Sequence, residues 1–130
     1  MPVYEFMAPT GAPTHDHRAE IARAVTKVHS ELTGAPARYV HCSFVEAPRG
    51  SMFIEGQETT SPRMIGLIRS GRSEELRGRL IHGIADAWSE ITGDPKDELA
   101  IFLYEVPGAN CFEYGSIVPE ASQDAGAVTS

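Results

Sequence analysis

The chain has 130 residues and a net charge of −7, because 18 Asp and Glu residues outnumber 11 Lys and Arg residues. This length fits one globular domain, and the acidic balance offers no basic surface to nucleic acid or to an anionic membrane. No apolar run approaches the roughly 20 residues that span a bilayer, and the two cysteines lack metal-ligand spacing. Because the amino terminus has no signal-peptide pattern, we expect a cytoplasmic protein with reduced thiols rather than a secreted, zinc-finger or DNA-binding one.

The first predicted strand covers Pro2–Ala8, where apolar and polar residues partly alternate before a loop rich in Pro, Gly and Thr. A helix follows, and Gly34 with Pro36 beyond it marks its end. Its apolar stripe, at helical spacing, consists of Ile21, Val25, Val28 and Leu32. The next strand is predicted from the alternation of Val40, Cys42 and Phe44.

The same order of elements then returns along the chain. Met64–Arg69 is the third predicted strand, and Ser73 is placed to cap the helix that follows it. The stripe of this second helix consists of Leu76, Leu80, Ile84 and Ile91. The last strand is predicted from Leu99, Ile101 and Leu103.

An internal repeat relates these two halves. Ser30–Pro36 returns as Ser89–Pro95, 59 residues later, and Glu46 and Pro48 recur at the same spacing. Seven of the 19 positions from residue 30 to residue 48 are identical in the two copies. Unrelated segments would share about one, at roughly 5–7% per position. Two copies are too few for a solenoid, so the pattern indicates a duplicated half-domain.

Each half therefore predicts a strand–helix–strand unit whose two strands run parallel. The units cover about residues 2–59 and 61–118 of a single α+β domain, 1–118, and we expect a flexible tail at residues 119–130. Paired, the units form a four-stranded mixed sheet with both helices on one face. The other face of such a sheet needs cover, which implies self-association.

Pro2 is the first candidate for chemistry. A proline at the start of a strand is ordinary, since its missing N–H costs nothing there. If Met1 is removed, however, Pro2 carries a free secondary amine that can act as a base or an acid, depending on its neighbours. With Met1 retained, the nitrogen is an amide and does neither.

The segment Arg69–Ser73 lies where a strand ends and a helix begins. Helix amino termini favour anions, and two arginines add planar donors suited to a carboxylate. The alternative is that Arg69 and Arg72 are a pair of solvated surface side chains.

Two further residues are candidates on weaker grounds. His29 lies beside the stripe of the first helix, where a boundary histidine without a functional role is common. Glu113 follows the last strand, where a lone glutamate is normally solvated. No metal is assigned, because the remaining histidines show no further ligands at recognisable spacing. These histidines, which carry no functional signal, are His15, His17, His41 and His82.

The candidate residues differ between the two copies, whereas the apolar positions persist. At a spacing of 59 residues the pairs are His29 with Trp88, Arg69 with Thr10, and Pro2 with Ser61. This asymmetry is expected if both copies kept the apolar core after duplication but each chain kept only one functional site.

These features together resemble the tautomerase superfamily, and within it the cis-3-chloroacrylic acid dehalogenase group. The resemblance rests on Pro2–Tyr4, His29–Gly34, Arg69–Ser73 and Glu113–Gly115, and it extends from Pro2 to about Pro119. It implies the tautomerase (MIF-like) fold of two fused β-α-β units and a homotrimer whose sheets surround a central core. It also implies sites near subunit boundaries, with no metal or organic cofactor.

The resemblance implies roles for five residues. Pro2 would be the catalytic acid or base, and Arg69 and Arg72 would bind the substrate carboxylate with help from His29. Glu113 would position or activate water.

One position departs from the family pattern. The dehalogenases have a tyrosine on the last strand, where this chain has Phe102, whose ring cannot take part in activating water through a hydrogen bond. Tyr104 lies two residues on, nominally on the same face, but about 6–7 Å further along the strand.

The leading hypothesis is therefore an enzyme that moves a proton on a small carboxylate substrate, with keto–enol tautomerisation of 2-oxo acids as its reaction. Hydration or hydrolytic dehalogenation of acetylenic or haloacrylic acids ranks second because of Phe102. The non-enzymatic alternatives are an α+β module that binds small acids, which needs the arginines but no free proline amine, and a purely structural interaction domain.

Overall fold

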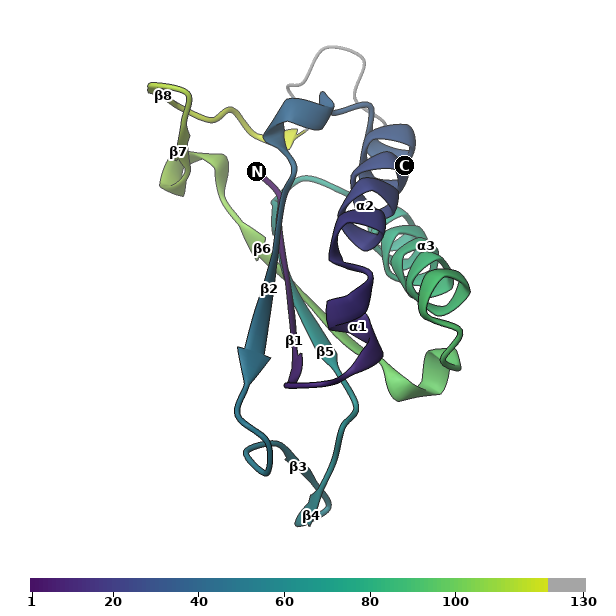
Figure 1. Ribbon diagram of the computed structural model, residues 1–130. Helices are drawn as coiled ribbons and strands as arrows, with labels where there is room; N and C mark the ends of the chain where they lie inside the picture. The colour runs from purple at the N-terminus through teal and green to yellow at the C-terminus, as the bar shows by residue number, and fades with distance from the viewer. Residues whose placement is uncertain (122–130) are drawn as a thin grey trace.

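The computed structural model describes residues 1–121, and Figure 1 shows a single curved sheet with helices packed along one of its faces. The main sheet has four strands in the order β2-β1-β5-β6. The predicted α+β class, with a mixed sheet and its helices on one face, is confirmed.

Both predicted strand–helix–strand units are present. The elements of the first are β1 (Val3–Pro9), the short α1 (Pro13–Asp16), α2 (Arg18–Thr33), η1 (Ala37–Tyr39) and β2 (His41–Ala47). Those of the second are β5 (Arg63–Arg69), α3 (Glu74–Thr92), η2 (Lys96–Glu98) and β6 (Ala100–Val106). β1 and β2 pair in parallel, as do β5 and β6, while β1 and β5 pair antiparallel at the centre of the sheet.

Left-handed glycines end both long helices. Gly34 (φ 77°) follows α2 and Gly93 (φ 79°) follows α3, and the Ser73 side chain accepts a hydrogen bond from the Leu76 backbone N–H at the start of α3. A positive φ is nearly free for glycine and costly for other residues. The helix boundaries were therefore readable from the sequence.

The core lies between the helices and one face of the sheet. Its fully buried members include Phe6, Ile68, Val25, Leu80, Ile84 and Trp88. Tyr4 also packs here, over Gly66 of the neighbouring strand β5, where an added Cβ would come within 2.9 Å of the tyrosine ring. The missing side chain at Gly66 thus leaves room for the Tyr4 ring.

The spacing between equivalent residues of the two halves is not constant along the chain. The burial patterns of β1 and β5 align Tyr4 with Met64, a spacing of 60 residues rather than 59. The connection from strand to helix is one residue longer in the first copy. The structural counterpart of Pro2 is therefore Pro62, not Ser61, and that of Arg69 is Pro9.

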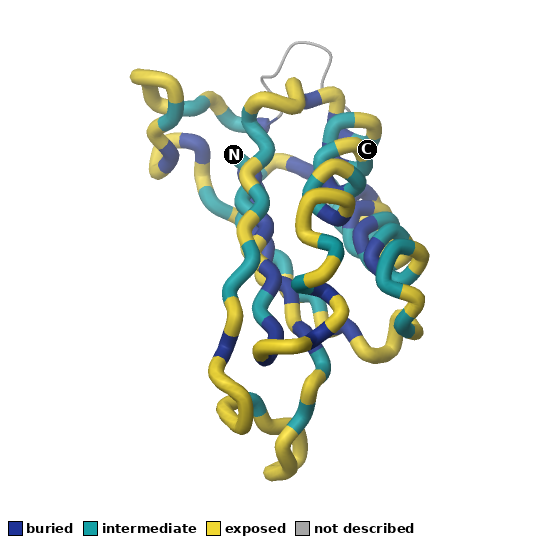
Figure 2. The backbone as a smooth tube through the Cα atoms, in the orientation of Figure 1, coloured by how far each residue is buried: buried dark blue, intermediate teal, exposed yellow. Residues whose placement is uncertain are grey.

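Two small hairpins, which were not predicted from the sequence, extend beyond the main sheet. They consist of β3 (Phe53–Ile54) with β4 (Gln57–Glu58), and β7 (Phe112–Glu113) with β8 (Ser116–Ile117). Each turns through two residues with positive φ, of which the second is a glycine, as two-residue hairpins require. They project from opposite ends of the molecule, and much of their surface is exposed (Figure 2).

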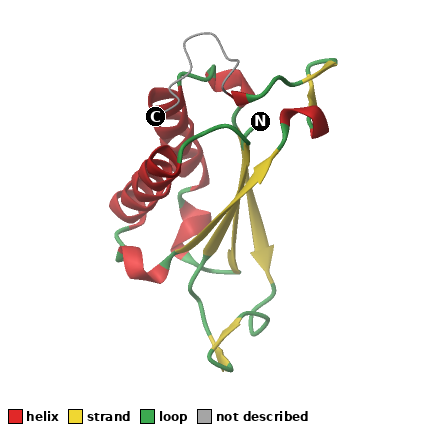
Figure 3. Cartoon of the chain, turned by 180° about the vertical axis from the view of Figure 1, so that it is seen from behind, coloured by secondary structure: helices red, strands yellow, loops and turns green. Residues whose placement is uncertain are grey.

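The sheet face opposite the helices is uncovered in a single chain. Seen from behind, no helix crosses it (Figure 3). It exposes Ile65, Phe102 and Tyr104, the last two by more than half.

The beginning of the expected tail is packed. Ala121 is fully buried and its N–H donates to the Ser70 carbonyl, while Glu120 accepts a hydrogen bond from the Gly108 N–H. The rest of the tail, residues 122–130, lies outside the described residues. Within the described part, no helix has the length and apolar character needed to cross a membrane.

Candidate active site

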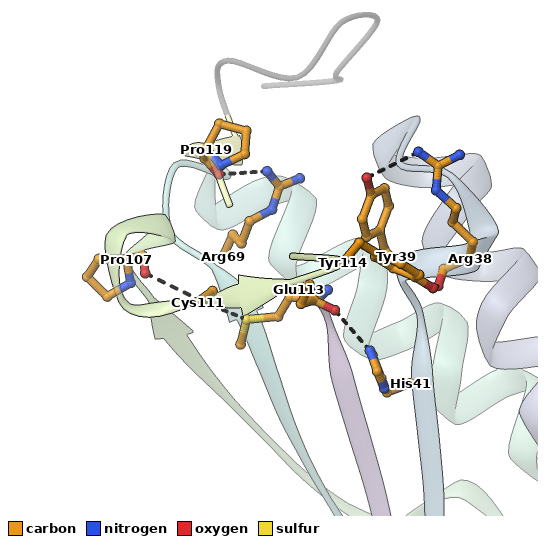
Figure 4. Close-up of polar contacts among 10 residues, drawn as sticks. Arg38, Tyr39, His41, Arg69, Pro107, Cys111, Glu113, Tyr114 and Pro119 are labelled. Carbon is orange, nitrogen blue, oxygen red and sulfur yellow. Dashed lines mark hydrogen bonds and ion pairs between the residues drawn. The ribbon is translucent and has the colours of Figure 1, made fainter. Parts of the chain in front are cut away.

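A pocket of about 250 Å³ opens where the amino terminus of β1 meets the carboxyl end of β5. Its wall includes four charged groups from distant parts of the sequence: the Met1 amino terminus, Arg38, Arg69 and Glu113. The remaining lining residues are Gly34, Pro36, Tyr39, Ser116, Ile117, Val118 and Pro119. Figure 4 shows how the β7–β8 hairpin brings Glu113 over this end of the sheet.

Glu113 pairs directly with the amino terminus. The Met1 ammonium forms an ion pair with Glu113 Oε1, and Glu113 is largely buried. Pro2, the next residue, is buried, and its carbonyl accepts a hydrogen bond from the His41 N–H at 2.9 Å. A carboxylate and the amino terminus of the chain therefore lie together at the pocket wall.

Arg69 and Arg72 are buried, with only 6% and 5% of their surfaces exposed. Arg69 Nη1 donates to the Pro119 carbonyl at 2.8 Å (Figure 4). Arg72 precedes the amino terminus of α3, and its carbonyl accepts a hydrogen bond from Arg77 Nη1 at 2.7 Å. These are not solvated surface arginines, because water reaches little of either side chain.

His29 lies in the core stripe of α2 and is 2% exposed. Its Nδ1 is 2.7 Å from the Tyr4 hydroxyl. Burial, and then the positive charges of Arg72, the amino terminus and Arg69, lower the pKa of His29 to about 3. His29 is therefore neutral at pH 7, in the field of the other candidate groups.

We assign the proton of the neutral His29 ring from its contact with Tyr4. Burial, the largest influence, raises the pKa of the Tyr4 hydroxyl above its usual range, so that the hydroxyl stays protonated. We assign it as the donor to Nδ1, which leaves the imidazole proton on Nε2.

Phe102 and Tyr104 lie elsewhere. Both point to the uncovered face of the sheet from β6, opposite Ile65 and Leu67 of β5, and neither lines the pocket of its own chain. Of the residues singled out from the sequence, Arg69 and Glu113 line the pocket, and Pro2 directly follows Met1, which also lines it. Arg72 and His29 are buried and are not among the lining residues, and Phe102 and Tyr104 lie apart on the sheet.

The sequence gives His41 no functional signal, and it does not single out three other residues that contribute to this end of the molecule, Tyr4, Arg38 and Tyr39. Tyr4 looked like an ordinary strand residue, and Arg38 and Tyr39 belong to a single 3-10 turn with no periodic signal. Only the contrast between the repeats could have singled out His41, whose counterpart is Ala100.

A second pocket, of about 260 Å³, lies at the other end of β1 and is related to the first by the repeat. Its lining residues include Pro62, Asp94, Pro95 and Glu98. Of these, Pro95 and Glu98 correspond to Pro36 and Tyr39 in the first pocket. Pro62 is internal, so its nitrogen is an amide. The counterpart of His29 is Trp88, which is buried and donates to Thr14 Oγ1 at 3.0 Å. Only the first pocket can offer a free amine beside arginines.

The described residues contain no group of three or more His, Cys, Asp or Glu side chains arranged to hold a metal ion. The polar groups in the first pocket suit a small anion, since Arg38 and Arg69 line it and the amino terminus adds a further positive charge.

Comparison with known families decides the relationship. The sequence profile of Tautomerase_3, the oxalocrotonate tautomerase enzyme family, matches residues 1–128. The chain belongs to the tautomerase superfamily. No curated protein matches the sequence significantly.

Solved structures place the chain beside the dehalogenase group of this superfamily. Native Ps01740 is 32% identical over 85% of this chain and 99% of its own, with a TM-score of 0.81. N1, a member of the cis-3-chloroacrylic acid dehalogenase family, is 26% identical over 93% of this chain and 86% of its own, with a TM-score of 0.85. Pt0534, solved after inactivation by 2-oxo-3-pentynoate, is 26% identical over 94% of this chain and 99% of its own, with a TM-score of 0.77.

More distant matches support the fold alone. Fused 4-OT chains solved as trimers are 17–20% identical to this chain, with TM-scores of 0.78–0.80.

Proposed function

We propose that this tautomerase-superfamily protein catalyses keto–enol tautomerisation of a small 2-oxo acid, with Pro2 as the proton-transfer group after removal of Met1. One observation carries the proposal. The amino terminus and Glu113 form an ion pair in the wall of the pocket that Arg69 also lines. The pocket wall therefore combines the amino-terminal end of the chain, where Pro2 would carry the amine once Met1 is removed, with an arginine suited to a carboxylate.

The substrate carboxylate binds to Arg69 and Arg72, whose guanidinium groups form planar, charge-assisted hydrogen bonds. His29 lies in the electrostatic field of both arginines, and as a neutral imidazole it adds an N–H donor without adding charge. This arrangement fixes the orientation of the acid before any proton moves.

The Pro2 amine takes the proton from the enol hydroxyl, and the prolinium then returns a proton to the carbon, forming the ketone. One proton leaves oxygen and one arrives at carbon, so the amine ends in its starting state. Glu113 stabilises the prolinium between the two transfers.

Two opposite influences meet at this end of the chain. A carboxylate such as Glu113, which pairs with the Met1 amino terminus in the structure, favours a charged amine, whereas nearby arginines and burial favour a neutral one. A balance of this kind is what a group needs if it both accepts and donates a proton at one pH.

A second candidate function is addition of water to an unsaturated acid, as in hydrolytic dehalogenation. The 26% identity with N1, a member of the cis-3-chloroacrylic acid dehalogenase family, favours it. In this reaction Glu113 activates water and Pro2 protonates carbon. We rank it second because the Phe102 side chain has no hydroxyl.

The decisive experiment begins with intact-mass analysis, which reports whether Met1 is absent. Ketonisation of the enol form of phenylpyruvate and halide release from cis-3-chloroacrylate are then measured on one preparation of wild type and of Pro2→Ala. We expect wild type to ketonise the enol faster than it releases halide, and Pro2→Ala to lose at least 100-fold in kcat, within the range that acid–base groups contribute.

Retention of Met1, or a Pro2→Ala variant as active as wild type, would contradict the proline mechanism and favour the acid-binding module. Rapid halide release with slow ketonisation would instead reverse the order of the two reactions.

A further inference from the structure

His41, the first residue of β2, makes two contacts that join the parts of the site. Its backbone N–H donates to the Pro2 carbonyl at 2.9 Å, and its side-chain Nε2 lies 2.9 Å from Glu113 Oε2. Glu113 Oε1 meets the amino terminus. One residue therefore anchors the backbone of Pro2 and the carboxylate beside it, as Figure 4 shows for the side-chain contact.

Comparison of the two repeats shows which of the two His41 contacts belongs to the fold. Ala100 occupies the matching position in the second copy, and its N–H donates to the Pro62 carbonyl at 3.4 Å. The backbone contact is thus common to both halves and belongs to the fold. The imidazole occurs only in the half whose proline can have a free amine.

We propose that His41 is a positioning residue for Glu113, holding the carboxylate with Oε1 toward the amino-terminal nitrogen. This inference rests on the proposed function of Pro2. Glu113 comes from the two-residue strand β7 of a small hairpin, which alone is a weak support for a side chain. A hydrogen bond from Nε2 to the far oxygen fixes the plane of the carboxylate and leaves the near oxygen for the prolinium.

The contact between His41 and Glu113 lies outside the hydrophobic core. The His41 side chain is 56% exposed, whereas that of Glu113 is 14% exposed. Removing the imidazole therefore creates no buried cavity, and a change in activity can be separated from a change in folding.

The test uses four variants of the full chain with Met1 removed: His41→Ala, His41→Gln, Pro2→Ala and, as a matched control, His17→Ala. Gln places an amide N–H at a similar reach to Nε2, so it restores the hydrogen bond. His17 also contacts a glutamate, Glu20 at 3.2 Å, but on the surface of α2. Ketonisation of the enol of phenylpyruvate gives kcat and KM, and thermal melting reports folding.

We expect His41→Ala to lower kcat about tenfold with KM within about twofold of wild type, since the arginines that bind the carboxylate are untouched. His41→Gln should recover most of the lost kcat, and His17→Ala should match wild type. All three should melt within a few degrees of wild type.

If His41→Ala keeps the wild-type kcat while Pro2→Ala is inactive, the positioning role is wrong and the proline mechanism stands. If His41→Gln is as slow as His41→Ala, a hydrogen bond to Glu113 is not what the imidazole supplies, and the inference fails. If Pro2→Ala is fully active, the proposed function itself fails.

Discussion

His29 and Tyr4 form a buried polar pair at the boundary between the core and the site. The hydrogen bond of 2.7 Å between them satisfies two groups that would be costly to bury alone. Because His29 stays neutral near Arg69 and Arg72, it adds no repulsion to a site that already holds several positive charges. A charged imidazole here would favour anions but would have to be desolvated beside two arginines.

This pair predicts a pH dependence of stability. The pKa of His29 is about 3 in the folded protein and about 6.5 in an unfolded chain, so the unfolded chain binds more protons between these values. The free energy of unfolding should therefore rise with pH across this window, by up to about 1.4 kcal/mol per pH unit from this one group, and level off above it.

Urea denaturation of wild type and of His29→Gln, at fixed protein concentration and at several pH values from 4 to 7.5, measures this slope. His29→Gln should lose the contribution, and His17→Gln, at a partly exposed histidine, should keep it. An unchanged slope in His29→Gln would mean that the buried imidazole is not the titrating group.

At the scale of elements, each half of the repeat has an ion pair at the same position, which links its long helix to its edge strand. Arg18 of α2 contacts Glu46 of β2, and Arg77 of α3 contacts Glu105 of β6. Only the second pair adds a link to the site, because Arg77 Nη1 also donates to the Arg72 carbonyl at 2.7 Å.

The two ion pairs give a controlled prediction. Both are partly exposed, so Arg18→Ala and Arg77→Ala should each cost less than about 1 kcal/mol of stability. Arg77→Ala should also raise KM about fivefold, since the loss of one hydrogen bond of about 1 kcal/mol loosens the segment that presents Arg72. Arg72→Ala should raise KM further, because the carboxylate loses the guanidinium itself.

Steady-state kinetics on the three variants check this, with Arg18→Ala as the reference for an ion pair remote from the pocket. Equal KM values for Arg77→Ala and Arg18→Ala would show that the Arg77 contact does not affect Arg72.

The long elements were predictable because their signals are local. Gly34 and Gly93 mark helix ends by a conformation that glycine adopts at little cost, and the repeat ties the two halves together. The hairpins were not predictable, since strands of two residues have no measurable alternation. Their turns, Glu55-Gly56 and Tyr114-Gly115, replace the usual Asn or Asp with residues that rarely adopt a positive φ.

The sequence pointed to some of the residues around the pocket but not to their contacts. Pro2, Arg69, Arg72 and Glu113 stood out by position or charge. The link through His41 could not be found by residue type, because it depends on β2 lying beside β1, where one residue reaches both Pro2 and Glu113. The change of spacing between the repeats also misaligned Pro2 with Ser61.

At the scale of the whole molecule, the uncovered face of the sheet is an apolar surface that a single chain leaves open to solvent. Ile65, Phe102 and Tyr104 lie side by side on neighbouring strands there, because Phe102 pairs with Ile65 in the β5–β6 register. Apolar side chains gathered on a sheet face favour association with another sheet. The fused 4-OT structures with the same fold are trimers.

We therefore expect this chain to form a homotrimer through that face, and a charge at its centre should prevent assembly. Phe102→Asp would bury an unpaired carboxylate against apolar side chains, a cost of several kcal/mol at each of the equivalent positions. Light scattering after size exclusion should give three times the chain mass for wild type and the 14.1 kDa chain for Phe102→Asp. Ala19→Asp, on the exposed face of α2, adds the same charge and should leave the trimer intact. A trimeric Phe102→Asp, or a monomeric wild type, would place the association surface elsewhere or remove it. The distinction bears on the site as well, because Phe102 and Tyr104 can reach a pocket only if that pocket belongs to a neighbouring copy.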